Sequence, residues 1–199
     1  MRQPRIMLAD DHRLMLEGLQ RLLHGHGEVV GTFEDGQSLL QAAPLLKPDL
    51  ILLDISMPGL NGLDTARRLK AHLPECKIIF LTMHSDPMYA AEAFIAGGSG
   101  YVLKSSAATE LIQAIQVVLG GKPYASPSVV KDLLLPFLDG TIRPDAADGI
   151  SVQEREVLRM MAEGRPATEI AEELNITVGE AVEDISRVIE LLNLQRAIR

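Results

Sequence analysis

The chain has 199 residues, of which 47% are hydrophobic, enough to bury one large core or two small ones. Its formal net charge of −8 argues against a protein that binds nucleic acid non-specifically over its whole surface. A single cysteine, Cys76, excludes an internal disulfide and favours a reducing compartment.

The N-terminal stretch MRQPRIMLADDH lacks the apolar run of a signal peptide. The chain also has no uncharged apolar stretch of the roughly 18 residues that a membrane-spanning helix needs. We therefore expect a cytoplasmic protein with no membrane partner.

In chain order, residues 1–120 alternate between apolar runs and amphipathic segments. The third and fourth runs, DLILLD and KIIFLT, are apolar almost throughout, as in strands that are buried on both faces of a parallel sheet. The segments between the runs have the spacing of helices. The predicted strands are 5–9, 29–33, 49–54, 77–82 and 100–104, and the predicted helices are 13–24, 37–43, 63–72, 88–96 and 109–119. Five strand–helix pairs predict a doubly wound α/β domain with a five-stranded parallel sheet.

Residues 121–150 have the composition of a linker. Two stretches rich in Gly, Pro and Asp flank SVVKDLLLPFL, which predicts a short helix. From residue 151 the pattern is helical again, over 153–163, 168–174 and 178–192. Three short helices with tight connections predict a small all-α domain at 151–199, and a helix-turn-helix is one option.

Polar residues stand where the predicted strands of 1–120 end. A single Asp at such a place is usually a turn residue or a helix cap. In a parallel sheet, however, the carboxyl ends of the strands meet at one edge, where open α/β sheets form their ligand sites. Several such residues together therefore favour a functional site. They are Asp10, Asp11, Asp54, Thr82 and Lys104.

Three carboxylates and one lysine indicate the chemistry of this site. Oxygen-rich sites suit Mg²⁺, while a lysine and a threonine hydroxyl suit phosphate oxygens. An aspartate beside a metal can act as the nucleophile toward phosphorus and form an aspartyl-phosphate. Other nucleotide sites are excluded, because no GxGxxG follows the first strand and no glycine-rich loop carries a Walker lysine.

The motifs LADDH, LLDISMPGLNGLD, FLTMHS and GYVLKSS, in this order over 1–120, resemble the receiver domain of two-component response regulators, which has a flavodoxin-like fold. The resemblance implies that a sensor histidine kinase phosphorylates Asp54. A related chemistry is that of aspartate-nucleophile phosphatases, which carry a second Asp two residues after the nucleophile. Ser56 stands at that place, so we do not expect an enzyme.

The same resemblance assigns roles to the other residues of the site. Those implied to bind Mg²⁺ are Asp11, Asp54, the backbone carbonyl of Ser56 and, through a water molecule, Asp10. Those implied to hold the phosphoryl oxygens are Thr82 and Lys104, and the implied switch aromatic is Tyr101.

Residues 151–194 resemble the LuxR-type helix-turn-helix of the NarL/FixJ group, in the motifs EREVLRMMAEG and EIAEELNIT. The resemblance implies a transcription regulator whose third helix lies in the DNA major groove. Here that helix carries Val182 and Asp184 where the family usually has a lysine and a histidine. The candidate DNA-facing residues are Glu180, Glu183, Asp184 and Arg187.

The charge of the third helix leaves two functions open. Residues 178–192 hold one base and four acids, a balance of −3, and DNA repels acids that face it. One hypothesis is a transcription regulator that can form a homodimer on phosphorylation and that binds DNA with an affinity weakened by these acids. The alternative is a degenerate helix-turn-helix that has lost DNA affinity and acts through protein–protein contacts.

Overall fold

The computed structural model describes residues 2–129 and, in the C-terminal part, 151–153, 156–157, 160, 167–177, 180–181 and 184. The chain divides into two compact units, which are considered one at a time: Met1–His84 with Glu92–Tyr124, and Ser85–Ala91 with Ala125–Arg199. The domain boundaries at 120 and 150 stay predictions. Among the described helices, none combines the length and the apolar character that crossing a membrane requires.

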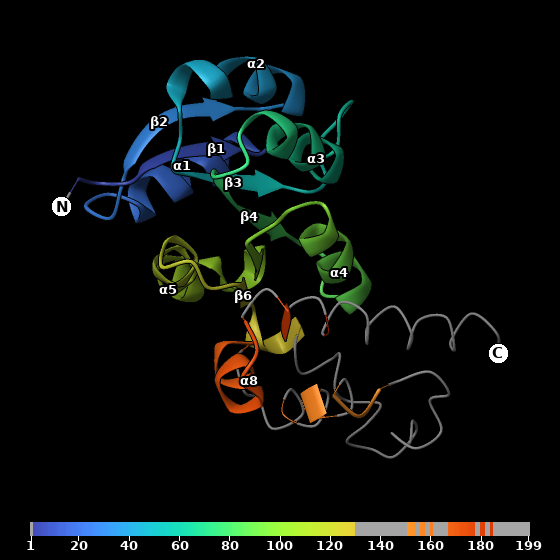
Figure 1. The fold of residues 1–199 in the computed structure, drawn as a ribbon. Helices are drawn as coiled ribbons and strands as arrows, with labels where there is room; N and C mark the ends of the chain where they lie inside the picture. The colour runs from blue at the N-terminus through green and yellow to red at the C-terminus, as the bar shows by residue number, and fades with distance from the viewer. Residues whose placement is uncertain are drawn as a thin grey trace. The chain divides into compact units, whose positions relative to one another are not determined.

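A sheet in the order β2-β1-β3-β4-β5-β6 forms the centre of the first unit (Figure 1). Neighbouring strands from β2 to β5 pair in parallel, as the apolar runs predicted. From β1 the chain continues to β2 on one side of the sheet, and from β3 it continues to β4 and β5 on the other side. The switch point of the fold therefore lies between the carboxyl ends of β1 and β3. The five long strands are β1 (Arg5–Ala9), β2 (Glu28–Phe33), β3 (Leu50–Asp54), β4 (Lys77–Thr82) and β5 (Gly100–Leu103).

The sheet has six strands, so the predicted number of five is wrong by one. The additional strand, β6 (Tyr124–Ala125), has only two residues, and the Tyr124 amide donates to the Ser99 carbonyl at 3.2 Å. Two residues are too few to show the period-two alternation by which a strand is found in a sequence. Residues 124–125 were therefore assigned to the predicted linker, 121–150, instead of to a strand.

Helices cover both faces of this sheet. Helices α1 (Arg13–Leu22) and α5 (Ala107–Leu119) share one apolar cluster with Leu50 and Leu52 of β3. All five residues of β3 are buried, so the alternate residues Ile51 and Leu53 are covered on the other face. Figure 1 shows α2 (Gly36–Leu46) and α3 (Gly62–His72) together on that side. Burial on both faces explains the continuous apolar runs in the sequence.

Element ends differ from the prediction at two places that matter. Helix α2 runs through Pro44 to Leu46 instead of ending at Ala43, because the Lys47 amide donates to the Ala43 carbonyl at 2.9 Å and restores the helical pattern beyond the proline. Strand β5 ends at Leu103, and Lys104 begins a short 3₁₀ turn, η1 (Lys104–Ser106). Helix α4 (Pro87–Ile95) begins and ends one residue before the predicted helix 88–96.

The second unit has a core of its own. Helix α8 (Ala167–Leu174) contributes Ile170 and Ala171 to a buried apolar cluster with Val157, Met160 and Ala181. Residues 127–129, 152–153, 156–157, 160, 180–181 and 184 are also helical. This agrees with the predicted small all-α domain. The remainder of the predicted linker helix, and residues 178–179, 182–183 and 185–192 of the predicted third helix, lie outside the described residues.

Candidate functional site

The carboxyl ends of β1, β3, β4 and β5 bring the predicted polar residues to one edge of the sheet. Asp10 is 1% exposed and Asp54 is 2% exposed, and Thr82 is fully buried. The Lys104 side chain is also buried, while that of Asp11 is 30% exposed. Charged groups are rarely buried to this degree unless they are paired or bind a ligand, and their convergence at one edge supports the predicted functional site.

Local sequence explains how the acids are held. The Asp10 carboxylate accepts a hydrogen bond from the His12 amide at 2.9 Å, which turns the chain from β1 into α1. After β3, the Gly62 amide donates to the Ile55 carbonyl at 2.9 Å, and a side chain at residue 62 would collide with the backbone carbonyl of Asp54. The glycine that ends MPGLNG thus lets α3 begin directly beside Asp54.

Lys104 is the positive charge of the site. Its ammonium lies 2.8 Å from Asp10 Oδ2 and 2.8 Å from Asp54 Oδ2. Desolvation lowers the pKa of Lys104, but the contacts with Asp10 and Asp54 outweigh it, so the net pKa is raised. The lysine is therefore fully charged at neutral pH. Three carboxylates around one ammonium leave an excess of two negative charges, which favours a further cation.

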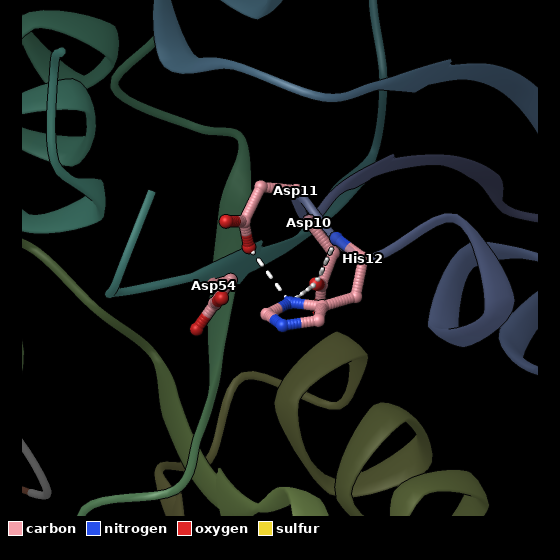
Figure 2. Close-up of side chains that lie close together, drawn as sticks. All are labelled: Asp10, Asp11, His12 and Asp54. Atoms are coloured by element: carbon pink, nitrogen blue, oxygen red, sulfur yellow. Dashed lines mark hydrogen bonds and ion pairs between the residues drawn. The ribbon is translucent and has the colours of Figure 1, made fainter. Parts of the chain in front are cut away.

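The acidic edge fits a divalent metal ion. Ligand atoms from Asp10, Asp11, His12 and Asp54 all lie within 4.8 Å of one another (Figure 2). Asp10 Oδ2 and Asp11 Oδ1 are buried atoms without a well-directed hydrogen bond, although a nitrogen lies 2.8 Å from each, on Lys104 and His12 respectively. Carboxylate oxygens that keep free lone pairs in a buried site are what Mg²⁺ coordination requires.

His12 is a member of this cluster that our sequence analysis missed. Its Nδ1 lies 2.8 Å from Asp11 Oδ1 and 3.2 Å from Asp10 Oδ1, and Figure 2 shows the ring turned toward the carboxylates. The ring is otherwise mostly exposed, at 71%. The signal in the sequence was its place directly after two acids, in the motif LADDH, but no role of its own was predicted for it.

A second residue that was not predicted, His84, connects Thr82 to Tyr101. Its amide donates to Thr82 Oγ1 at 3.1 Å, and its carbonyl accepts from the hydroxyl of the fully buried Tyr101 at 2.8 Å. Its Nε2 lies 3.1 Å from Ser56 Oγ, and the Ser56 amide donates to Asp54 Oδ1 at 3.2 Å. One loop residue therefore contacts three of the predicted site positions.

Two acids of the predicted third helix, Glu180 and Asp184, form hydrogen bonds with other residues of the second unit. Glu180 accepts from the Thr177 amide at 2.7 Å, and Thr177 Oγ1 accepts from the Glu180 amide at 3.2 Å, which is a capping box at the start of the helix. Asp184 Oδ2 accepts from Gln153 Nε2 at 2.8 Å. Glu183 and Arg187 lie outside the described residues.

Comparison with known protein families identifies both domains of the chain. Residues 6–116 match the family model of the response regulator receiver domain, and residues 148–191 match that of the bacterial regulatory proteins of the luxR family.

The chain belongs to the response-regulator family.

Similar proteins agree over nearly the full length of this response regulator. The transcriptional regulatory protein DesR of Bacillus subtilis is 36% identical over 195 residues, which are 97% of the chain and 92% of DesR. The transcriptional regulatory protein MctR of Rhizobium johnstonii is 34% identical over 179 residues, 89% of the chain and 81% of MctR.

Solved structures lead to the same family. A structure of the RcsB response regulator of Salmonella typhimurium is 31% identical, with a TM-score of 0.64 over 97% of the chain and 93% of RcsB. An RcsB–DNA complex is 31% identical, with a TM-score of 0.61 over 95% and 92%.

These findings confirm the predicted combination of a receiver domain and a LuxR-type helix-turn-helix domain. They favour a transcription regulator over the alternative of a degenerate output domain that acts only through protein contacts.

Proposed function

We propose that this response regulator accepts a phosphoryl group on Asp54 from a sensor histidine kinase. The observation that carries the proposal is the short pairing of Asp54 Oδ2 with Lys104 Nζ at 2.8 Å inside a buried acidic edge. In the transfer, a carboxylate oxygen of Asp54 forms a bond to phosphorus while the phosphorus–nitrogen bond to the kinase histidine breaks. Lys104 is placed to balance the charge that the phosphoryl group adds, and Thr82 is placed to bind one of its oxygens.

We propose that Asp11 and Asp54 hold Mg²⁺, with Asp10 acting through water and Ser56 through its backbone carbonyl. When bound, the ion neutralises and orients the phosphoryl oxygens. The Ser56 assignment rests on the resemblance to the family, while the three carboxylates also have the supporting geometry of the cluster.

The test is phosphorylation by a small donor. With acetyl phosphate and Mg²⁺, the full chain should gain the mass of one phosphoryl group, and Asp54→Asn should gain none. Asp64→Asn is the matched control, because Asp64 is a half-exposed acid at the start of α3. Labelling of Asp54→Asn to the extent of the wild type would disprove the assignment.

We further propose that phosphorylation favours a homodimer that binds DNA through the output domain. The contacts of His84 with Thr82 and Tyr101 support this, because a shift of Thr82 toward a phosphoryl oxygen would pull on the loop that holds the buried tyrosine. We place the protein in the cytoplasm, the compartment favoured by its single, buried Cys76.

We infer that a single output domain binds DNA weakly, so that the dimer supplies much of the affinity. Two linked domains bind more tightly than one because of their high effective concentration at the DNA. The support is that Glu180 and Asp184 carry negative charge on the helix that the family places in the major groove. Val182→Lys with Asp184→His should strengthen DNA binding and steepen its salt dependence, by about 0.9 in the logarithmic slope for each additional phosphate that the domain neutralises.

A further inference from the structure

We propose that His12 determines the metal selectivity of the acidic edge, by adding an imidazole nitrogen to the carboxylate ligands of the divalent ion. This inference rests on the proposed metal site. It predicts that the site binds Co²⁺, which accepts nitrogen ligands more readily than Mg²⁺ or Mn²⁺ do, more tightly than carboxylates alone would allow.

The spacing of the ligand atoms supports this role. In an octahedral complex with bonds of about 2.1 Å, neighbouring ligands are roughly 3.0 Å apart. His12 Nδ1 lies 2.8 Å from Asp11 Oδ1 and 3.2 Å from Asp10 Oδ1, so these three atoms are spaced like neighbouring corners around one ion. Opposite corners would be roughly 4.2 Å apart. All ligand atoms of the cluster lie within 4.8 Å of one another, so binding one ion requires at most a small contraction.

The surroundings of the ring leave it available to a metal. Asp11 Oδ1 is a buried atom without a well-directed hydrogen bond, even though His12 Nδ1 is close to it. His12 is the N-cap residue of α1, but its side chain makes no capping hydrogen bond. The ring is 71% exposed, so the opposite nitrogen, Nε2, can keep its proton in contact with solvent. The imidazole is thus fixed by the carboxylates alone and can bind an ion with Nδ1.

The chemistry of the donor set gives the direction of the selectivity. Mg²⁺ prefers oxygen ligands, whereas imidazole suits Co²⁺, Ni²⁺ and Zn²⁺, and affinity rises along the series from Mn²⁺ to Co²⁺. Replacing one water in the coordination shell by an imidazole therefore raises affinity for Co²⁺ much more than for Mg²⁺. Loss of the imidazole should therefore weaken Co²⁺ binding and leave Mg²⁺ binding nearly unchanged.

The experiment is a metal titration of the full chain and two variants. Co²⁺ binding is followed by its visible absorption, Mn²⁺ binding by electron paramagnetic resonance of the free ion, and Mg²⁺ binding by competition with Mn²⁺. His12→Gln should weaken Co²⁺ binding by about tenfold, the scale on which groups that tune a metal site act. The control, His24→Gln, removes an exposed histidine outside the cluster and should change none of the affinities.

The outcomes separate this inference from the proposed function. If the wild type binds Mg²⁺ but His12→Gln keeps the Co²⁺ to Mg²⁺ affinity ratio of the wild type, the role of His12 is disproved and the Mg²⁺ site stands. If His12→Gln raises the affinity for all three ions equally, His12 only competes for Asp11 as a hydrogen-bond donor, and the inference is also disproved. If the wild type binds none of the ions, the metal site itself is wrong.

Discussion

Acidic residues have different uses in the two units of this protein. In the first unit, Asp10 and Asp54 are almost completely buried, and both lie 2.8 Å from the ammonium of Lys104. In the second unit, Glu180 is exposed and bonded to Thr177, and Asp184 is bonded to Gln153. Asp10 Oδ2 is a buried oxygen without a well-directed hydrogen bond, whereas Glu180 and Asp184 accept hydrogen bonds from their own domain.

The number of acidic residues in a region does not determine their role, because the role depends on burial and on the neighbouring groups. Strand ends that converge at one edge concentrate carboxylates and remove water, so their charge has to be met by a cation. An acid in the first turn of an exposed helix instead meets the free backbone amides of that turn. Hydrogen bonds from the Thr177 amide and hydroxyl lower the pKa of Glu180, so it stays negative on the surface that should approach DNA.

Removal of the lysine should have the largest effect on stability. Lys104→Met leaves Asp10 and Asp54 buried without a counter-charge, and we expect a loss of about 3–5 kcal/mol in the free energy of unfolding, as for other broken buried pairs. Urea unfolding with and without Mg²⁺ measures this, and Mg²⁺ should restore part of the loss. Lys122→Met, at an exposed position, is the control. Equal stability of the two variants would show that Lys104 does not balance the acids.

The same lysine should make stability depend on alkaline pH. Because its pKa in the folded protein is raised above the ordinary value of 10.5, its contribution is complete below pH 10.5 and is lost as the pH rises through the folded-state pKa. The free energy of unfolding should therefore fall above pH 10.5 more steeply in the wild type than in Lys104→Met. Parallel profiles of the two proteins would contradict this.

Loss of the helix cap should have a smaller effect, confined to the second unit. Thr177→Ala removes the acceptor of the Glu180 amide and should destabilise that helix by about 1 kcal/mol. Hydrogen exchange at the Ala181 amide, which donates to the Thr177 carbonyl, reports this directly and should become faster. Glu172→Ala, at an exposed position of α8, should leave the exchange unchanged. If both variants exchange alike, the capping box does not stabilise the helix.

Neutralising Asp184 should change stability least. Asp184→Asn keeps an oxygen that can accept from Gln153 and removes only the charge, so the free energy of unfolding should stay within about 0.5 kcal/mol of the wild type. Asp184→Ala, which also removes the acceptor, should be less stable than Asp184→Asn in the same urea titration. The reverse order would mean that the contact with Gln153 is not stabilising.

The sequence predicted the sheet and the members of its edge because both depend on long, regular patterns. Apolar runs located β1 to β5 within a residue or two, and the topology of a parallel sheet then placed Asp10, Asp54, Thr82 and Lys104 together. The two-residue strand β6 had no such pattern and was missed.

Contacts that depend on a single side chain or loop could not be predicted in the same way. The role of His84 follows from where the loop after β4 folds back, which no spacing in the sequence indicates. The capping box could have been predicted from the sequence, because TVGE has a threonine three residues before a glutamate at the start of an apolar helical pattern.

We propose that phosphorylation of Asp54 controls DNA binding by the output domain. The most direct test of this proposal is fluorescence anisotropy with duplex DNA selected from a random library by the beryllofluoride-treated full chain. With Mg²⁺ and BeF₃⁻, which mimics the phosphoryl group, the wild type should bind this DNA more tightly than without BeF₃⁻, and Asp54→Asn should show no such increase. Equal affinity of the wild type with and without BeF₃⁻ would contradict the account.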